Sequence, residues 1–128
     1  MSFASGDDAM EIALAKIKAV FEPDFSVHPE RPAKMGTILT TKPVMVVKRL
    51  GGDFMESFQD VLADDPLLDI DIYSSKGIED AYAKGSYVRR TLKRELGCSG
   101  GTGVVPIPVS NEASLTRAVN ITMSMYVE

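Results

Sequence analysis

The chain has 128 residues, of which 45% are hydrophobic and 25% charged, and these values are typical of one globular domain rather than of a disordered or fibrous protein. Its net charge of -4 argues weakly against a dedicated nucleic-acid binder, and the sequence has no apolar run long enough to span a membrane. The first residues lack the basic and apolar regions of a secretory signal, so we expect the protein to be made and kept in a cytoplasm. Because it has one cysteine and one histidine, we expect no internal disulfide, no structural metal and no cofactor.

The first predicted elements are a helix and a long loop. Ser5 is an N-cap candidate, and helical spacing of apolar residues continues until Pro23, so the helix should end near Glu22. Its apolar face consists of Met10, Ala13, Leu14, Ile17, Val20 and Phe21. Residues 23 to 42 contain three prolines and little periodicity, which predicts an extended arm, with a short strand at residues 37 to 41 as an option. Loops of this length are usually functional or disordered, so the arm is a candidate for binding a partner.

A strand is predicted at residues 43 to 50, where a β-branched run follows Pro43, and Gly51 and Gly52 should end it. The segment from Gly52 to Pro66 allows two structures. A short helix fits the capping-box spacing of Asp53 and Glu56. It also fits the helical spacing of four apolar residues, namely Phe54, Phe58, Val61 and Leu62. An extended excursion fits equally, because so short a pattern does not separate helix from strand.

A strand followed by a helix, from residue 66 to residue 96, is the central unit of the chain. Leu68, Ile70 and Ile72 alternate with polar residues, which predicts a strand with one buried face. In residues 76 to 96 the apolar positions change to helical spacing and form one arc, made of Ile78, Ala81, Tyr82, Gly85, Val88, Leu92 and Leu96. This helix should cover the sheet.

Three residues of the predicted helix have particular roles. Gly85 lies within the arc, where a missing side chain lets the helix approach the sheet closely. Arg89 lies close to the arc, so its guanidinium must reach solvent or a carboxylate. Gly97 is the expected residue after the C-terminus of the helix.

Two further strands are predicted after the helix. A glycine-rich connection at residues 98 to 103 follows a helix instead of opening one, so it is not a phosphate-binding loop. Residues 104 to 109 form a strand in which Pro106 and Pro108 remove donors from one side, as at a protected edge. Residues 115 to 127 would be the longest strand, about 43 Å at 3.3 Å per residue. Its apolar face consists of Val119, Ile121, Met123, Met125 and Val127.

These elements predict a single α+β domain over residues 1 to 128. We expect a mainly antiparallel four-stranded sheet, covered by two helices and carrying the long extended arm.

Charge is distributed unevenly over two neighbouring segments. Residues 53 to 71 contain no Lys or Arg and seven acids, Asp53, Glu56, Asp60, Asp64, Asp65, Asp69 and Asp71. The C-terminal half of the predicted helix is basic and contains Lys84, Arg89, Arg90, Lys93 and Arg94. These are either two solvated faces or complementary surfaces where identical subunits meet head to tail.

The residue inventory does not favour an enzyme. Cys98 and His28 lie in different predicted loops, and no third group is identified that would orient them as a catalytic pair. Asp69 and Asp71 share one strand face, where they could bind a divalent cation or act as an acid/base pair, but a solvated sheet face explains them as well. The basic helix has Tyr87 as its one aromatic residue outside the core arc, which weakens the case for nucleic-acid stacking.

The order of these elements resembles the tail terminator proteins of long, non-contractile-tailed bacteriophages. The resemblance is carried by PVMVVKRLGG and DPLLDIDIYSSKGIEDAYAKGSYVRRTL, which are similar to that family's core strand, Gly-Gly turn, second strand and helix. It covers most of residues 7 to 127 and consists of hydrophobicity and turn patterns instead of a catalytic signature.

The resemblance implies a structural virion protein, made in the host bacterial cytoplasm, that forms a hexameric ring at the head-proximal end of the tail tube. Such a ring ends tube growth and joins the head, so its partners would be other copies of itself, the tail tube protein and a head-completion protein. DNA would pass through the ring without specific binding. The alternatives are another head-tail connector or tail-tube protein, or a small nucleic-acid-binding regulator that uses the helix at residues 76 to 96.

For a ring we assign two candidate surfaces. The candidate subunit interface comprises Lys84, Arg89, Arg90, Lys93, Arg94, Asp53, Glu56 and Asp60. The candidate channel lining comprises Asp64, Asp65, Asp69 and Asp71, whose charge would repel DNA phosphates. The same acids cannot all face both the channel and a neighbour's basic helix.

Overall fold

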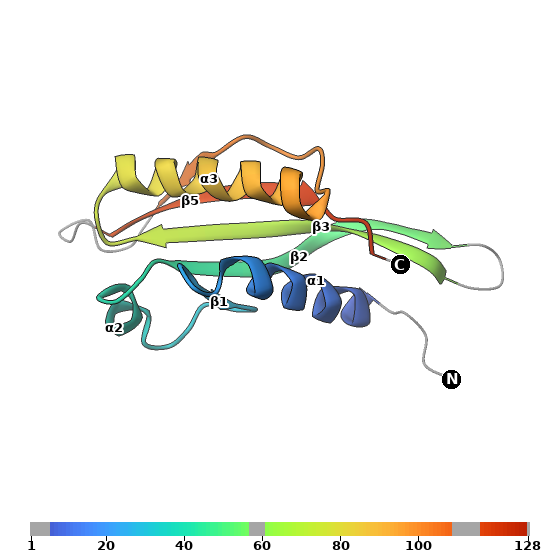
Figure 1. Ribbon diagram of the computed structural model, residues 1–128, viewed down its shortest axis with the longest axis horizontal. Coiled ribbons are helices and arrows are strands. Elements are labelled where there is room, and N and C mark those ends of the chain that lie inside the picture. The colour runs from blue at the N-terminus through green and yellow to red at the C-terminus, as the bar shows by residue number, and fades with distance from the viewer. Residues whose placement is uncertain (1–5, 57–60, 109–115, 128) are drawn as a thin grey trace.

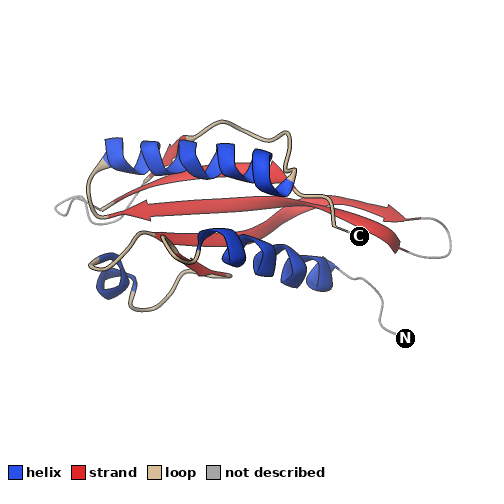
Figure 2. Ribbon diagram, in the orientation of Figure 1, coloured by secondary structure: helices blue, strands red, loops and turns tan. Residues whose placement is uncertain are grey.

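The computed structural model describes residues 6–56, 61–108 and 116–127, and for residues 6–8, 51–56 and 61–65 it defines the backbone alone. Within these residues the chain forms a mixed α+β domain (Figures 1 and 2). The helices are α1 (Gly6–Phe21), α2 (Met35–Leu39) and α3 (Ile78–Leu96). The strands are β1 (Ser26–His28), β2 (Val44–Glu56), β3 (Val61–Ser74), β4 (Val105–Ile107) and β5 (Arg117–Ser124). The predicted N-cap Ser5 and the outer ends of the last two predicted strands, residues 109 and 115, lie outside the described residues.

The strands form one open sheet in the order β1-β2-β3-β5-β4. β2, β3, β5 and β4 are antiparallel neighbours, which is the predicted four-stranded array. The prediction missed the fifth strand, because β1 pairs with β2 in parallel, from Ser26 opposite Val44 to His28 opposite Val46. Three residues are too few for a periodic pattern to reveal a strand.

One face of the sheet is covered by α1 and α3, as predicted. Figure 1 shows α3 running along β5 and α1 running along β2. The predicted apolar positions Ala13, Ile17 and Phe21 of α1, and Ala81, Val88 and Leu92 of α3, are buried in one cluster with the sheet residues Met45, Val47, Leu68, Ile70, Ile72, Val119, Ile121 and Met123. This shared cluster is the main core.

The opposite face, which we call the open sheet face, carries a smaller core at one end. Here α2 packs Met35 and Leu39 against Val44, Val46 and Tyr73. The prediction of an extended arm at residues 23 to 42 is therefore wrong, because β1 and α2 fold this segment onto its own sheet. Of the optional strand at residues 37 to 41, residues 37 to 39 belong to α2, and residues 40 and 41 form the turn after it. Burial of two apolar side chains compensates for the weak intrinsic stability of a five-residue helix.

Gly51 and Gly52 do not end the first predicted strand. β2 continues through both glycines to Glu56, with a register shift between Arg49 and Gly51, and pairs with β3 as a long hairpin. Of the two structures that the sequence allowed between Gly52 and Pro66, the described residues adopt the extended one. The antiparallel ladder supplies the hydrogen bonds that offset the poor strand propensity of glycine.

The last strand is shorter than predicted. Its predicted apolar face is buried from Val119 to Val127, but β5 ends at Ser124, where its partner strand reaches Leu67. The longest strand is instead β3, with 14 residues. β4 lies at the sheet edge beside β5 with Pro106 inside it, as predicted for a protected edge.

The glycine predictions for α3 are confirmed. Gly97 ends the helix in the left-handed conformation, with φ 66°. At Gly85 an added Cβ would lie 2.8 Å from Val119 Cγ2 and 2.9 Å from Val104 Cγ1, so the helix touches both the sheet and the loop before β4.

We expect Gly85→Ala to lower the free energy of unfolding by up to about 2 kcal/mol. Overpacking against two stiff valines costs about 1 to 3 kcal/mol, and the helix-propensity gain of about 1 kcal/mol offsets part of this cost. Ser86→Ala, one residue further along α3, is the matched control and should change stability by less than about 0.5 kcal/mol. Urea unfolding checks both variants, and a stabilised Gly85→Ala protein would contradict the close approach.

Candidate subunit interface

The hairpin of β2 and β3 extends beyond the rest of the sheet as a two-stranded ribbon. β5 pairs with β3 from Leu67 to Ser74, whereas residues 61 to 65 pair with β2 alone. Figure 1 shows this end of the hairpin projecting past the end of α3. We call residues 53 to 56 and 61 to 65 the acidic ribbon, because they include Asp53, Glu56, Asp64 and Asp65 and no Lys or Arg. Asp60 of the predicted interface lies outside the described residues.

A ribbon of this kind lacks the support that other strands give each other. Within the described residues no third strand pairs with it. An isolated two-stranded hairpin is marginally stable in water, and it gains stability when a further strand or helix packs against it. Its location and charge therefore make the ribbon a candidate contact surface.

Asp69 and Asp71 are separated from the ribbon and lie on the open sheet face. The Asn120 side-chain amide donates to Asp69 Oδ1 at 2.5 Å and to Asp71 Oδ1 at 2.7 Å. Lys48 Nζ lies 3.8 Å from Asp69 Oδ2 and 3.7 Å from Asp71 Oδ2. Both carboxylates are half-buried and already have partners, so the description of a simple solvated face does not fit them.

Some basic residues of α3 form hydrogen bonds or ion pairs within the described part of the chain, and others do not. Lys84 binds both carboxylate oxygens of Asp80, at 2.8 and 2.7 Å, and Arg94 contacts its neighbour Glu95 at 3.3 Å. Arg90 and Lys93 are exposed and form no hydrogen bond or ion pair with any residue that the structure describes. Of the predicted interface cations, these two are the most available to a partner.

Arg89 is held by a loop instead of a carboxylate. Its Nε donates to the carbonyl oxygen of Thr102 at 3.3 Å, which links α3 to the segment before β4. Between them lies a shallow groove of about 350 Å³, lined by Ser86, Arg89, Arg90, Gly103 and Val104, which we call the α3 groove. The sequence did not predict it, because the loop and the helix are brought together only by the fold.

The loop that forms one wall of the α3 groove is fixed along the edge of β5. Ser99 and Ser124 exchange two backbone hydrogen bonds, at 3.0 and 2.9 Å, and the Thr102 amide donates to the Thr122 carbonyl at 3.1 Å. The glycine-rich connection at residues 98 to 103 is thus hydrogen-bonded to the sheet.

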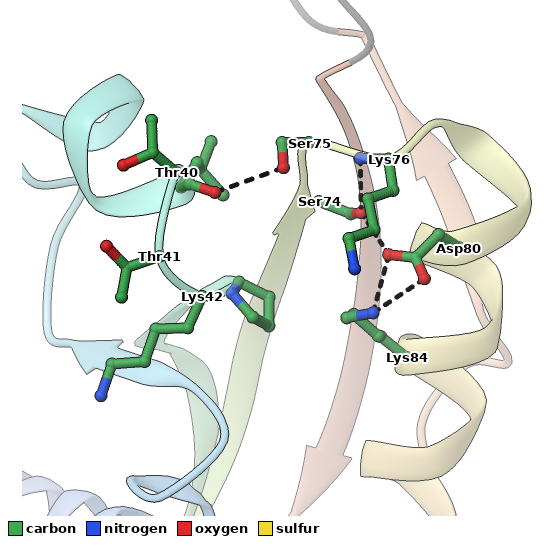
Figure 3. Close-up of a pocket in the computed structure, with 10 residues that line it drawn as sticks. Thr40, Thr41, Lys42, Ser74, Ser75, Lys76, Asp80 and Lys84 are labelled. Atoms are coloured by element: carbon green, nitrogen blue, oxygen red, sulfur yellow. Dashed lines mark hydrogen bonds and ion pairs between the residues drawn. The ribbon is translucent and has the colours of Figure 1, made fainter.

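A second pocket, of about 180 Å³, lies where β3 turns into α3 (Figure 3). Asp80 accepts hydrogen bonds from Ser74 and Lys84, while Ser75 donates to the Leu39 carbonyl at 3.2 Å and so joins the turn to α2. Partial burial opposes ionisation of Asp80, but the hydrogen bonds from Lys84 and Ser74 outweigh it and hold its pKa below the usual value. The carboxylate in this pocket serves to fix the strand-to-helix turn.

Cys98 and His28, the two residues considered for nucleophilic chemistry, lie on different faces of the sheet. Cys98 belongs to the main core, and burial raises the pKa of its thiol to about 11, although Lys16 acts in the opposite direction. His28 lies on β1 and hydrogen-bonds to Ser26 at 2.6 Å. The fold does not bring these two side chains together.

Within the described ranges, no three His, Cys, Asp or Glu side chains lie close enough to hold a metal ion, and no helix is both long and apolar enough to cross a bilayer. No protein-family model matches the chain, and no curated protein is similar to it in sequence.

The charged residues could be identified from the sequence, but their partners could not. Asn120, which joins Asp69 and Asp71, is distant from both in the sequence. The one available signal was the position of Asn120 on the polar face of the last predicted strand. If this strand pairs with the strand that carries the two acids, Asn120 can lie on the same sheet face as the acids. Thr102, which holds Arg89, carried no signal.

Proposed function

We propose that the protein is a ring-forming structural subunit of a bacteriophage tail, the terminator that ends growth of the tail tube at its head-proximal end. The observation that carries the proposal is that one chain has an acidic ribbon with no third strand beside it and, elsewhere, exposed cations, both without partners among the residues that the structure describes. The ribbon extends the sheet, whereas Arg90 and Lys93 lie on a helix that covers it.

Complementary surfaces at different places on one chain favour head-to-tail contacts. A two-fold dimer uses the same patch on both subunits, whereas two different patches generate a ring if the rotation closes. The assignment to a tail terminator, and the hexameric number, rest on the sequence resemblance. The partners are then the tail tube protein and a head-completion protein, and the location is the virion.

The candidate channel residues fall into two groups in this proposal. Asp69 and Asp71, on the face without long helices, are our candidates for the channel wall. Lys48 and Asn120 compensate them in part, so they repel DNA less than two free carboxylates would. Asp64 and Asp65 belong to the acidic ribbon and serve the contact between subunits.

We also propose that the protein has no catalytic role. The proposal is supported by the buried thiol of Cys98, whose pKa of about 11 leaves almost no thiolate at neutral pH.

Electron microscopy and sedimentation velocity of the purified protein test the ring. We expect closed rings, alone or on the ends of added tail tubes, and we expect tubes capped by the protein to stop growing. A chain that stays monomeric at high concentration and also with tail tubes present would contradict the proposal. Rings that leave tube growth unchanged would favour another head-tail connector, and tight DNA binding by the monomer would favour the nucleic-acid-binding regulator.

A further inference from the structure

We infer that the α3 groove receives the acidic ribbon of a second copy of this chain. The inference rests on the proposed ring and specifies which surfaces join its subunits. The groove contributes the cations and a rigid wall, and the ribbon contributes the carboxylates and an unsupported pair of strands.

The α3 groove is positively charged, and Arg89, one of its two arginines, is held in place. The hydrogen bond from Arg89 to the Thr102 carbonyl fixes that side chain across the groove, and Arg90 stands beside it on the surface. Val104 packs close to Gly85, which holds the loop wall against the helix. Preorganised cations lose less conformational freedom when they bind a carboxylate.

The same flank of α3 continues in both directions from the groove. Lys93 lies one turn beyond Arg89, and Tyr82 lies one turn before Ser86, with 37% of its surface exposed. The flank is therefore apolar at one end and basic at the other. The ribbon sequence has the same mixture, since it combines four acids with Phe54, Met55, Val61 and Leu62.

Within one chain, no described side chain pairs with the exposed cations Arg90 and Lys93 beside the α3 groove. Arg90 and Lys93 have no partner there, and the ribbon projects beyond the end of α3 along the axis of the sheet (Figure 1). Each copy has one ribbon and one groove, so contacts between copies can pair every ribbon with a groove. A nucleic acid also carries negative charge, but the acidic net charge of the chain and the apolar part of the flank favour the ribbon.

Charge reversal with rescue tests the inference. Arg90→Glu with Lys93→Glu changes two exposed residues that form no hydrogen bond or ion pair with the described residues, so the variant should keep the wild-type unfolding curve. We expect its association constant to fall at least tenfold at low salt. The association constant of Asp64→Lys with Asp65→Lys should fall similarly. An equimolar mixture of the two variants should form mixed rings, because the reversed groove of one variant attracts the reversed ribbon of the other, and the unchanged groove of the second attracts the unchanged ribbon of the first.

The matched control is Lys16→Glu with Lys34→Glu, which makes the same charge change at exposed positions outside the groove. It should assemble like the wild type. Sedimentation velocity at low and high salt measures all four proteins, and added salt should weaken wild-type assembly.

Cross-linking locates the contact directly. In a Cys98→Ser background, one protein carries Arg90→Cys and another Asp64→Cys. A bismaleimide should give covalent dimers when the two are mixed, and far fewer with either alone.

Two results would overturn the inference while leaving the ring intact: rings of wild-type stability from Arg90→Glu with Lys93→Glu, or no cross-linked dimers from the mixed cysteine variants. If the reversal abolished DNA binding but left assembly unchanged, the groove would be a nucleic-acid site and the inference would also be wrong. A wild-type protein without any rings, alone or on tubes, would instead contradict the proposed function itself.

Discussion

Gly101→Ala is expected to lower the free energy of unfolding by about 3 to 5 kcal/mol. Gly101 has φ +75°, and an added Cβ would lie 1.6 Å from the Thr122 carbonyl oxygen and 2.4 Å from its carbon. No small adjustment relieves so close a contact with the backbone. The loop must move away from β5 and lose the hydrogen bond between the Thr102 amide and the Thr122 carbonyl.

The neighbouring glycine supplies a matched control. Gly100 has φ +68°, but nothing lies within 4 Å of an added Cβ. Gly100→Ala therefore has the cost of the left-handed backbone alone, about 1 to 2 kcal/mol. Urea unfolding of both variants separates the two effects, and hydrogen exchange at the Thr102 amide should accelerate in Gly101→Ala. Equal destabilisation by the two substitutions would contradict the contact with β5.

Gly101→Ala should also affect assembly, because the loop that it displaces is one wall of the α3 groove. We expect Gly101→Ala to weaken association under conditions where the monomer remains folded. Gly100→Ala should assemble like the wild type under the same conditions.

Phe21→Ala is expected to lower the free energy of unfolding by about 3 to 5 kcal/mol. Phe21 is the last residue of α1 and is only 1% exposed. Its ring lies edge-on to Phe25, with centroids 5.7 Å apart, and to Tyr87 of α3, with centroids 6.2 Å apart. Truncation leaves a cavity between the two covering helices and removes both aromatic contacts, each worth about 0.5 to 1.5 kcal/mol.

Ile12→Ala is the control on the same helix, because Ile12 is 39% exposed. It should cost no more than about 1 kcal/mol. Tyr87→Phe keeps the ring that Phe21 contacts and should change stability by less than about 0.5 kcal/mol. Thermal and urea unfolding measure all three, and a small effect of Phe21→Ala would mean that α1 does not pack on α3 as described.

The sequence predicted the parts of the fold that repeat over many residues. The alternation of Leu68, Ile70 and Ile72 predicted a strand whose apolar side is fully buried, and the spacing of Ala81, Val88 and Leu92 predicted a helix that covers the same core. Gly97 predicted where this helix ends. These patterns are local, and each has enough residues to separate one period from another.

Short or glycine-containing elements were missed because their stability comes from distant residues. β1 and α2 are three and five residues long, and they form against β2 and the open sheet face. Gly51 and Gly52 continue a strand because β3 pairs with them. β5 ends earlier than its own pattern predicts, because its regular pairing with β3 stops at Leu67.

For the candidate site, the sequence shows which segments are acidic and which are basic, and for the longer elements it indicates which face is buried. Which of these charges have partners inside the described part of the chain depends on the tertiary fold. Asp69 and Asp71 meet Asn120, and Arg89 meets Thr102, while Arg90 and Lys93 remain exposed. A charged group forms a hydrogen bond or an ion pair only with a partner a few ångströms away. Strand register and the path of the loops set the distances between residues that are far apart in the sequence.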